Sequence, residues 1–361
     1  MSKPELPVLD LRPDDYMPGP PKKKDYGIGA VGCGNIARNA HQRAYANCGY
    51  RTVACYDIKR EAAESMAKQY GIPTVCNSLE ELCRHPQVQI IDLAVHASIR
   101  REVMTQIVKA AGPQLLGIFS QKPFAMKFKD AVAMVKMCKE AGLPLMINQQ
   151  ARWAPGHRAL KHVIDTGMLG HVYSIVHFHR SFQDNPNSWV ATLPNFNIVD
   201  HGCHYIDLIR HYAGKEPVRV KCTAAMQPGQ AAVTPMCHTI LCEFKPSDML
   251  MAESHFNNII RTPRMHGYEW FVDGTEGSAM IDRGQLTVCF KSTPDHAQTY
   301  QLRGSWFPDA FGGSMGEMMA ALTEGREPMT SGADNLNTIR IVEAAVISAK
   351  TGRAVELKSI R

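Results

Sequence analysis

Apolar runs of strand length alternate with amphipathic helical patterns in the first part of the chain. The apolar runs lie at residues 26–31, 52–56, 90–94, 115–119 and 144–148, and the helical patterns between them lie near 35–47, 60–70, 99–111 and 128–140. Apolar strands that alternate with helices are typical of a parallel sheet with helices on both faces. The pattern therefore predicts a doubly wound α/β domain over residues 26–150.

The pattern changes after residue 151, where strands follow one another with few helices between them. Helical patterns near 156–166 and 199–213 precede strand patterns at 217–225, 237–244, 249–257, 268–273, 278–281 and 285–290, and helical patterns near 314–324 and 334–350 close the chain. Consecutive strands of this kind favour a large, open, mostly antiparallel sheet. Residues 151–361 are therefore predicted to form a second domain of the α+β class.

Residues 1–25 are rich in proline, which neither a helix interior nor a central strand accepts. We expect an extended arm. Two interpretations stay open. The arm is either disordered, or it lies on a neighbouring subunit through the apolar side chains of Leu6, Val8, Leu9 and Leu11.

Composition narrows the class of protein. The chain has 361 residues, of which 45% are hydrophobic and 20% charged, the usual mix for a globular protein with two domains. It contains no apolar run near the roughly 20 residues that cross a bilayer, and its polar, proline-rich start does not resemble a signal peptide. We therefore expect a cytoplasmic protein that does not interact with a membrane.

The cysteines and basic residues add two further expectations. The eleven cysteines include no C-x-x-C pair, which favours reduced thiols over a disulfide framework or a zinc site. The net charge of +6 includes one cluster, Lys22 to Lys24, whereas a nucleic-acid-binding protein spreads basic residues over a face and interleaves aromatic ones. We expect no nucleic-acid partner.

A glycine-rich segment follows the first predicted strand and opens the first predicted helix. It reads Gly32-Cys33-Gly34-Asn35-Ile36-Ala37. This is the G-x-G-x-x-A form of the Rossmann dinucleotide-binding motif, in which glycines let the backbone approach a pyrophosphate at a helix N-terminus. A second register, Gly27, Gly29 and Gly32, would place the phosphate loop inside the strand, and we reject it. The alternative to a cofactor site is a tight turn without a ligand.

Asp57 ends the second predicted strand, where an acidic side chain can accept hydrogen bonds from the adenosine ribose. Its negative charge would repel a 2′-phosphate, which favours NAD. Lys59 and Arg60 follow directly and could bind such a phosphate, so NADP stays open.

Two further segments carry candidate chemistry. Lys122 follows the apolar run at 115–119, at the strand end where ligands of parallel sheets bind, although it could be an ordinary surface lysine. The segment from Asp200 to Asp207 reads D-x-G-x-H-x-x-D, and Asp200 and His204 would share one helix face. Their alternatives are a helix N-cap and a hydrogen-bonded core histidine. A metal site formed by His201, His204 and Asp207 is less favoured, because no partner cysteine or carboxylate supports it.

These features occur in an order that resembles the glucose–fructose oxidoreductase/inositol dehydrogenase family. The ordered set is GCGNIA, then Asp57, Gln121-Lys122-Pro123, TGMLGHV at 166–172, D-x-G-x-H-x-x-D at 200–207, DGTEGS at 273–278 and the terminal helix from Asp334. The resemblance covers nearly everything from Tyr26 to about Leu357. It implies a Rossmann cofactor domain and a second domain, 151–361, for substrate binding and oligomerisation.

The resemblance also implies roles for individual residues. The family's catalytic lysine, aspartate and histidine correspond to Lys122, Asp200 and His204, and its Lys-Pro bond is commonly cis. An imidazole titrates near neutral pH, so His204 would be the general base for the substrate hydroxyl. Asp200 would orient the hydroxyl or the imidazole, and Lys122 would stabilise the developing alkoxide.

Other residues join the predicted sites by position. We assign Ala94, His96 and Gln121 to the cofactor site, although the segment 94–98 lacks the proline and histidine often present in the family, and Gln121 replaces the usual Glu. The predicted substrate site adds Arg152, Trp153 and His179. His177 and His179 would share one strand face, either towards a substrate or as a polar face between subunits.

The leading hypothesis is an NAD(P)-dependent oxidoreductase that converts a ring secondary alcohol of a sugar, glycoside or cyclitol into a ketone, reversibly. One alternative is an NAD-assisted lyase or glycosidase that oxidises the ring transiently. Another is a cofactor-binding regulator without catalysis, against which the joint presence of Lys122, Asp200 and His204 argues. By resemblance we expect a homo-oligomer, a dimer, tetramer or higher assembly, and no metal cofactor.

Overall fold

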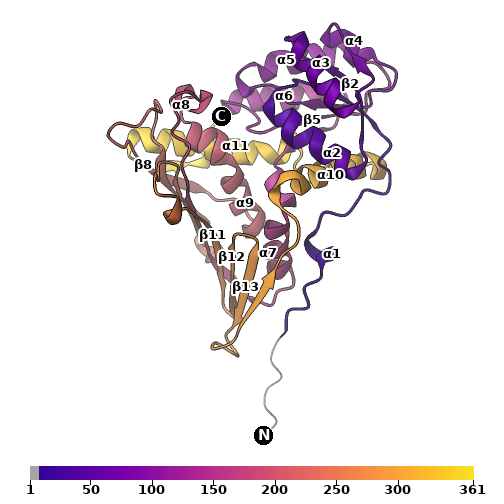
Figure 1. Ribbon diagram of the computed structural model, residues 1–361. Helices are drawn as coiled ribbons and strands as arrows, with labels where there is room; N and C mark the ends of the chain where they lie inside the picture. Colours follow the sequence, from indigo (N-terminus) through magenta and orange to yellow (C-terminus); the bar gives the residue numbers. More distant parts are fainter. Residues whose placement is uncertain (1–7) are drawn as a thin grey trace. The chain divides into compact units, whose positions relative to one another are not determined.

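The computed structural model describes residues 8–361, and its chain forms two compact units (Figure 1). The N-terminal unit contains residues 18–154 and 305–339, and the C-terminal unit contains residues 155–304, 340–361 and the described part of the arm up to Met17. The segment 305–339 therefore packs with the first part of the chain, from which it is distant in sequence. Helix α11 (Gly332–Thr351) has residues in both units.

The N-terminal unit is built on a six-stranded sheet of order β3-β2-β1-β4-β5-β6, with every neighbouring pair parallel. Its strands are β1 (Gly27–Val31), β2 (Arg51–Tyr56), β3 (Thr74–Val75), β4 (Ile90–Leu93), β5 (Gly117–Gln121) and β6 (Leu145–Asn148). Its helices are the π-helix η1 (Ala37–Gln42), α2 (Arg43–Cys48), α3 (Arg60–Tyr70), α4 (Leu79–Arg84), α5 (Ala97–Ala110), α6 (Phe128–Glu140), the 3-10 turn η2 (Gln150–Trp153), η6 (Trp306–Ala310) and α10 (Phe311–Glu324). The predicted doubly wound α/β architecture is confirmed. The predicted helix 35–47 is divided into η1 and α2.

Strand β1 lies in the centre of this sheet, and all five of its residues are buried. Gly27 and Gly29 lie inside the strand, which rules out a phosphate loop in that register. A Cβ atom at Gly27 would overlap the carbonyl oxygen of Gln87, so glycine is required for close packing. Gly71, at φ +68°, ends α3 in the left-handed conformation.

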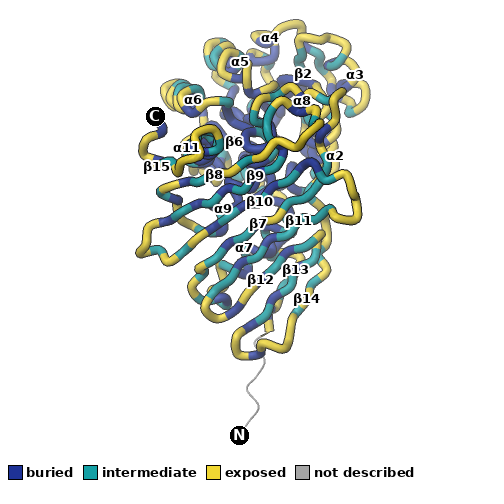
Figure 2. Tube along the Cα trace, turned by 90° about the vertical axis from the view of Figure 1, so that its left-hand side faces the viewer, coloured by how far each residue is buried: buried dark blue, intermediate teal, exposed yellow. Residues whose placement is uncertain are grey.

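The C-terminal unit is built on a nine-stranded sheet of order β14-β13-β12-β11-β7-β10-β9-β8-β15 (Figure 2). Its strands are β7 (Val172–Arg180), β8 (Arg219–Ala225), β9 (Cys237–Glu243), β10 (Met251–Asn257), β11 (Gly267–Gly274), β12 (Gly277–Asp282), β13 (Gln285–Phe290), β14 (Ala297–Gln301) and β15 (Val355–Glu356). Neighbours are antiparallel except β7 and β10, which are parallel. The predicted large, mostly antiparallel sheet is confirmed.

Helices cover one face of this sheet. They include α7 (Pro155–Asp165), the π-helix η3 (Asn197–His201) and α9 (Cys203–Ala213), with the short α8 (Trp189–Thr192) in the loop after β7. Burial alternates along the strands. In β7, Ile175 and His177 are buried, whereas Phe178, which lies between His177 and His179, is exposed. His177 and His179 share the helix-covered face, as predicted.

Residues 8–17 of the arm contact the C-terminal unit of their own chain. The backbone N–H of Leu9 donates to Gln298, and the hydroxyl of Tyr300 donates to the Leu9 carbonyl at 2.7 Å. The short helix α1 (Pro13–Tyr16) buries Tyr16, whose carbonyl accepts from Arg158 of α7. This part of the arm is therefore ordered on its own chain, which neither of the two interpretations anticipated. Leu6 lies outside the described residues.

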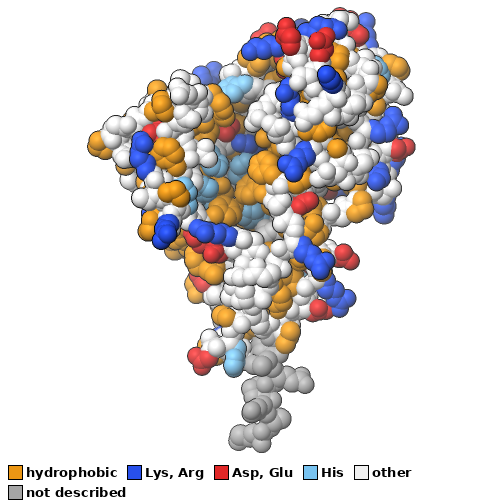
Figure 3. All heavy atoms as spheres, in the orientation of Figure 1, with side chains coloured by type: hydrophobic (Ala, Val, Ile, Leu, Met, Phe, Trp, Pro, Cys, Tyr) orange, Lys and Arg blue, Asp and Glu red, His pale blue; other side chains and the backbone are white. Residues whose placement is uncertain are grey.

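Within residues 8–361, the structure has no helix that is both long and apolar enough to cross a membrane. Each cysteine from Cys33 to Cys289 is a free thiol, in agreement with the prediction. Lys and Arg side chains are scattered over the face that Figure 3 shows, among acidic and apolar ones.

Candidate active site

The glycine-rich loop of the N-terminal unit begins at the end of β1. Gly32 has φ +91°, and a Cβ atom there would lie 2.9 Å from the carbonyl oxygen of Ala94, so both conformation and space require glycine. Gly34 differs, because a Cβ atom there would have no protein atom within 4 Å. Among residues 8–361, no contact demands glycine at this position. Close approach of a ligand to the loop backbone would demand it.

The carboxylate of Asp57, directly after β2, is held beside this loop. One of its oxygens accepts the backbone N–H of Cys33 at 2.7 Å, and the other accepts that of Lys59 at 2.8 Å. Each carboxylate oxygen has a second lone pair, so the group can still accept from ribose hydroxyls. Together, Gly34 and Asp57 fit a dinucleotide with an unphosphorylated ribose.

Other residues of the predicted cofactor site have partners near the same loops. The Arg60 guanidinium pairs with Glu64 and donates to Asn77 at 2.7 Å. Asn35 accepts from the Asn39 side chain at 2.5 Å, and Ile36 packs at the edge of an apolar cluster.

The loops after β4 and β5 carry the next predicted residues. His96 is the N-cap of α5 and accepts the N–H of Ser98. Gln121 is buried at the end of β5, and its Oε1 accepts the backbone N–H of Lys122 at 2.9 Å. The Lys122–Pro123 peptide bond is cis, as the resemblance implies.

Sequence reasoning missed Arg100, which connects these two loops. Its buried guanidinium donates to the carbonyl of Val95 at 2.6 Å, after β4, and to the carbonyls of Pro123 and Phe124, after β5. A buried arginine bound to backbone carbonyls fixes both loops at the carboxyl edge of the sheet. The sequence feature that could have identified Arg100 was its inward-facing position on the predicted helix.

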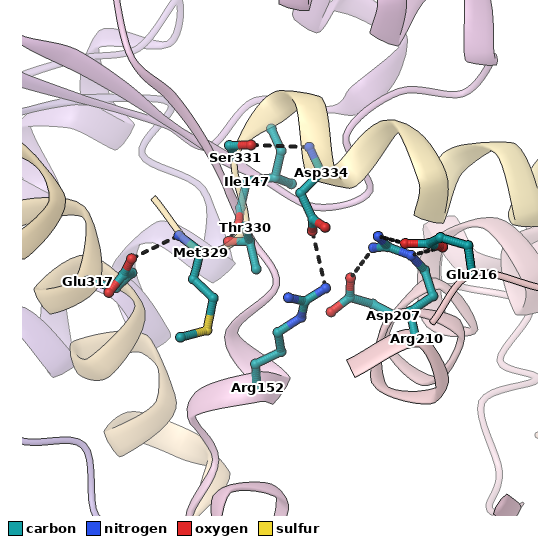
Figure 4. A network of polar contacts seen from close by, with 10 residues as sticks. All are labelled: Ile147, Arg152, Asp207, Arg210, Glu216, Glu317, Met329, Thr330, Ser331 and Asp334. Atoms are coloured by element: carbon teal, nitrogen blue, oxygen red, sulfur yellow. Dashed lines mark hydrogen bonds and ion pairs between the residues drawn. The ribbon is translucent and has the colours of Figure 1, made fainter. Parts of the chain in front are cut away.

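Arg152 lies in η2, after the end of β6, beside a segment from far along the chain (Figure 4). Thr330 and Ile147 exchange backbone and side-chain hydrogen bonds, and Asp334 at the start of α11 pairs with Arg152 at 3.2 Å. The guanidinium of Arg152 is thus held by a carboxylate that sequence reasoning did not assign to the site. Trp153 is buried in the apolar core with Phe311, where it supports this segment.

In the C-terminal unit, Asp200 and His204 lie on one continuous helical segment. Asp200 belongs to the π-helix η3, and His204 lies in the first turn of α9. A Cβ atom at Gly202, between them, would lie 2.6 Å from the carbonyl oxygen of Asn197. The glycine of D-x-G-x-H is therefore required for the change from π-helix to α-helix.

Asp207, the last residue of the D-x-G-x-H-x-x-D segment, forms an ion pair within the C-terminal unit. Asp207 is fully buried and pairs with Arg210 at 3.5 Å, and Arg210 also binds Glu216 (Figure 4). Among residues 8–361, no three His, Cys, Asp or Glu side chains are arranged to hold a metal ion.

Histidines of β7 face the helices of the same unit. Burial lowers the pKa of His179 to about 4 and holds that of His177 well below its usual range. His179 hydrogen-bonds Ser181 through Nε2 at 2.9 Å. Both imidazoles are therefore neutral at physiological pH and act as hydrogen-bonding groups rather than as charges.

Two family models match the chain. Residues 26–149 match an oxidoreductase family with an NAD-binding Rossmann fold, and residues 157–280 match the GFO/IDH/MocA C-terminal domain. The chain belongs to the GFO/IDH/MocA oxidoreductase family. It is thus an oxidoreductase whose residues 26–149 form an NAD-binding Rossmann domain.

Known proteins resemble the chain over almost its whole length. D-apiose dehydrogenase of Paraburkholderia graminis is 28% identical over 349 residues, which cover 91% of this chain and 89% of that protein. Inositol 2-dehydrogenase of Rhizobium meliloti is 22% identical, with 91% and 98% covered. An oxidoreductase from Agrobacterium radiobacter, solved with NAD+, L-tartaric acid and magnesium, shares the fold with a TM-score of 0.81 at 24% identity, covering 93% of this chain and all of that one.

Proposed function

We propose that the protein is an NAD-dependent dehydrogenase that oxidises a ring secondary alcohol of a sugar, glycoside or cyclitol to a ketone, or reduces that ketone. The observation that carries the proposal is the helical segment that presents Asp200 and His204 and requires glycine at position 202. The relatives named for apiose and inositol support the substrate class.

The roles of the chain's own groups follow from the chemistry of alcohol oxidation. Bound NAD supplies the acceptor for the hydride that leaves the substrate carbon. His204 takes the hydroxyl proton as general base, and Asp200 orients the hydroxyl or the imidazole. Lys122 stabilises the negative charge that develops on the oxygen. In the reverse direction His204 returns the proton.

The remaining site residues bind and orient. We assign the dinucleotide to Gly32, Gly34, Asn35, Ile36 and Asp57, with Ala94, His96, Arg60, Gln121 and Lys122 at its edges. The two hydrogen bonds that orient the Asp57 carboxylate support NAD over NADP. Arg152 binds substrate hydroxyls as a charged donor, and Trp153 supports Arg152 by packing. Both ring nitrogens of His179 are hydrogen-bonded, to Ser181 and Tyr205, so His179 acts on the substrate through these neighbours.

A panel of polyols, glycosides and cyclitols, assayed by the absorbance of reduced cofactor, tests the proposal. His204→Asn and Lys122→Met should each lower kcat by about 100-fold or more, because each removes one proton-transfer or charge-stabilising group. Binding of NADH should stay within about threefold for His204→Asn, since general-base catalysis and cofactor binding are separate contributions.

Three outcomes contradict the proposal. Full activity of His204→Asn would remove the assigned base. Substrate turnover with catalytic NAD and no net reduction would assign the chain to the NAD-assisted lyases or glycosidases. Cofactor binding without turnover of any compound would assign it to the regulators.

We also propose a cytoplasmic homo-oligomer. The free thiols suit a reducing compartment. The sheet face opposite to α7 and α9 carries exposed Phe178 and Met251, apolar area that a second copy would cover. Sedimentation velocity measures the assembly, and a monomer at micromolar concentration would contradict it.

A further inference from the structure

Five polar side chains in the C-terminal unit form a closed ring of hydrogen bonds next to the segment that carries Asp200. They come from β7 and the loop after it, from η3, from α9 and from the segment after β10: His179, Ser181, His201, Tyr205 and Asn258. The direction of each hydrogen bond in this ring follows from one fixed acceptor outside it.

That acceptor is the backbone carbonyl of Met236. The Nδ2 of Asn197 donates to it at 2.8 Å, so the Oδ1 of Asn197 must be the atom that faces Asn258. Asn258 therefore donates from Nδ2 to this oxygen, at 2.6 Å. The Oδ1 of Asn258 is then left to accept the hydroxyl proton of Ser181.

Two routes around the ring now lead to Tyr205. On one side, Ser181 donates to Asn258, so it must accept from Nε2 of His179. The Nδ1 of His179 then carries no proton, and it accepts the hydroxyl proton of Tyr205 at 3.3 Å. On the other side, Nδ2 of Asn258 donates to Nδ1 of His201 at 3.0 Å, which leaves the proton on Nε2, facing the Tyr205 oxygen at 3.4 Å. One route requires Tyr205 to donate and the other requires it to accept, and a hydroxyl does both.

The ring therefore accepts one protonation state. Both histidines are neutral and carry the proton on Nε2. A second proton on Nδ1 of His201 would face the amide donor of Asn258, and burial lowers the pKa of His179 to about 4. Burial raises the pKa of Tyr205 well above its usual value, which keeps its hydroxyl protonated. The other titratable groups around the ring are His177, His238, His266 and Tyr268, with Asp200, Cys203 and His204 on the segment itself.

The ring also holds both ends of the π-helix. The amide nitrogen of Asn258 contacts Asn197, the first residue of η3, and His201, the last. We infer that Asn258, oriented by the ring through Ser181 and Tyr205, is the positioning residue that keeps Asp200 in place for the reaction. The inference rests on the proposed role of Asp200. A π-turn is less stable than the regular helix, and such turns persist where surrounding contacts over-determine them.

The first experiment compares two tyrosine-to-phenylalanine changes on α9. Tyr205→Phe removes two bonds of the ring, whereas Tyr212→Phe, two turns later, removes one bond to the buried His157 and leaves the ring intact. We expect Tyr205→Phe to lower kcat about 10-fold or more through displacement of Asp200, with an unchanged KM for NAD. Tyr212→Phe should lose comparable stability and keep kcat within about twofold.

The second experiment changes Asn258 to Asp, which replaces the donor that faces both His201 and Asn197 by an acceptor. The lost bond to Asn197 does not depend on pH, because an amide does not titrate. A doubly protonated His201 would then fit the ring, donating from Nδ1 to residue 258 and from Nε2 to Tyr205. The ratio of variant to wild-type kcat should therefore rise as pH falls from about 8 to about 6, where an imidazole gains its proton. Taking the ratio cancels the titration of His204, which both proteins share.

Nitrogen-detected NMR of the histidine rings, which needs no turnover, completes the test. In the wild-type protein His179 and His201 should both carry the proton on Nε2 only, and in Asn258→Asp His201 should carry two. An Nδ1 proton on either ring in the wild type would overturn the hydrogen-bond directions. The expected tautomers together with an unchanged kcat in Tyr205→Phe would overturn the positioning role. If no sugar or cyclitol is oxidised but the tautomers are as expected, the proposed function fails and the ring stands.

Discussion

At the scale of single residues, Asp57 offers a direct test of the cofactor site. Asp57→Ala removes both the ribose acceptor and the two hydrogen bonds that tie the glycine-rich loop to the end of β2. A charge-assisted hydrogen bond contributes about 1.5–3 kcal/mol, so the Kd for NADH should rise about 10- to 100-fold. Titration of NADH fluorescence measures this. Asp14→Ala, a loss of an exposed carboxylate in α1, should leave the Kd unchanged, and equal Kd values for all three proteins would contradict the site.

Site residues that follow from local sequence were predictable, and those that depend on distant contacts were not. Gly32 and Asp57 could be found because the turn geometry and the strand end specify them within a few residues. Asp334 could not, because it is 182 residues from its partner Arg152, and no local pattern reports which segment packs against β6. The sequence places Arg100 on an inward-facing position of its predicted helix but does not identify its partners, which are backbone carbonyls of two loops.

At the scale of elements, the π-helix η3 predicts the effect of a single methyl group. Gly202→Ala would place Cβ 2.6 Å from the carbonyl oxygen of Asn197 and 2.9 Å from that of Ile198, so the turn must open. We expect kcat to fall about 10-fold or more, because Asp200 moves, and stability to fall by about 1–3 kcal/mol, as for other overpacked sites. Thermal unfolding and steady-state kinetics measure both.

The matched control is Gly156→Ala in α7 of the same unit. Its Cβ would meet Ile281 at an ordinary 3.4 Å, and alanine favours a helix over glycine. This variant should keep its activity and its stability. A Gly202→Ala protein as active as Gly156→Ala would show that the π-turn is not needed for the reaction.

Periodicity found most elements but not their irregularities. Buried strands such as β1 and β4 appear in the sequence as apolar runs. In amphipathic helices such as α3 and α6, apolar residues recur with a period of 3.6. Strand β14 was missed because it is an edge strand without a buried residue, so its sequence has no apolar alternation. The π-turns were missed because a helical period assumes a regular turn. Both ends of η3 are hydrogen-bonded to Asn258, which is far from them in sequence.

At the scale of the whole molecule, the fold class was predictable because it depends on the order of strands and helices. Which segments of the chain belong to each unit was less predictable. The helix α10 lies late in the sequence, yet Met315 and Met318 pack in one apolar core with Ile28 and Phe119 of the first sheet. A helix with a broadly apolar surface can pack on either unit, and the sequence alone does not state which.

The histidines buried in the C-terminal unit make the stability of the molecule depend on pH. Burial lowers the pKa of His157 and His238 to about 3 and that of His179 to about 4, against about 6.5 in the unfolded chain. The folded state therefore binds fewer protons than the unfolded state below pH about 6.5. Stability is fully present above that pH and is lost as pH falls from about 6.5 towards 4 and then 3.

Each of these histidines should contribute a slope of about 1.4 kcal/mol per pH unit near pH 5, where the unfolded imidazoles are almost fully protonated and the folded ones are not. The free energy of unfolding, measured with denaturant at a series of pH values, gives the slope. His157→Gln removes one titrating group and should reduce the slope by about that amount, whatever it does to stability at neutral pH. His296→Gln, a change at an exposed histidine, should leave the slope as it is. A free energy of unfolding that stays constant between about pH 7 and about pH 5 would mean that these imidazoles take up protons inside the folded unit, against the cost of burying their charge.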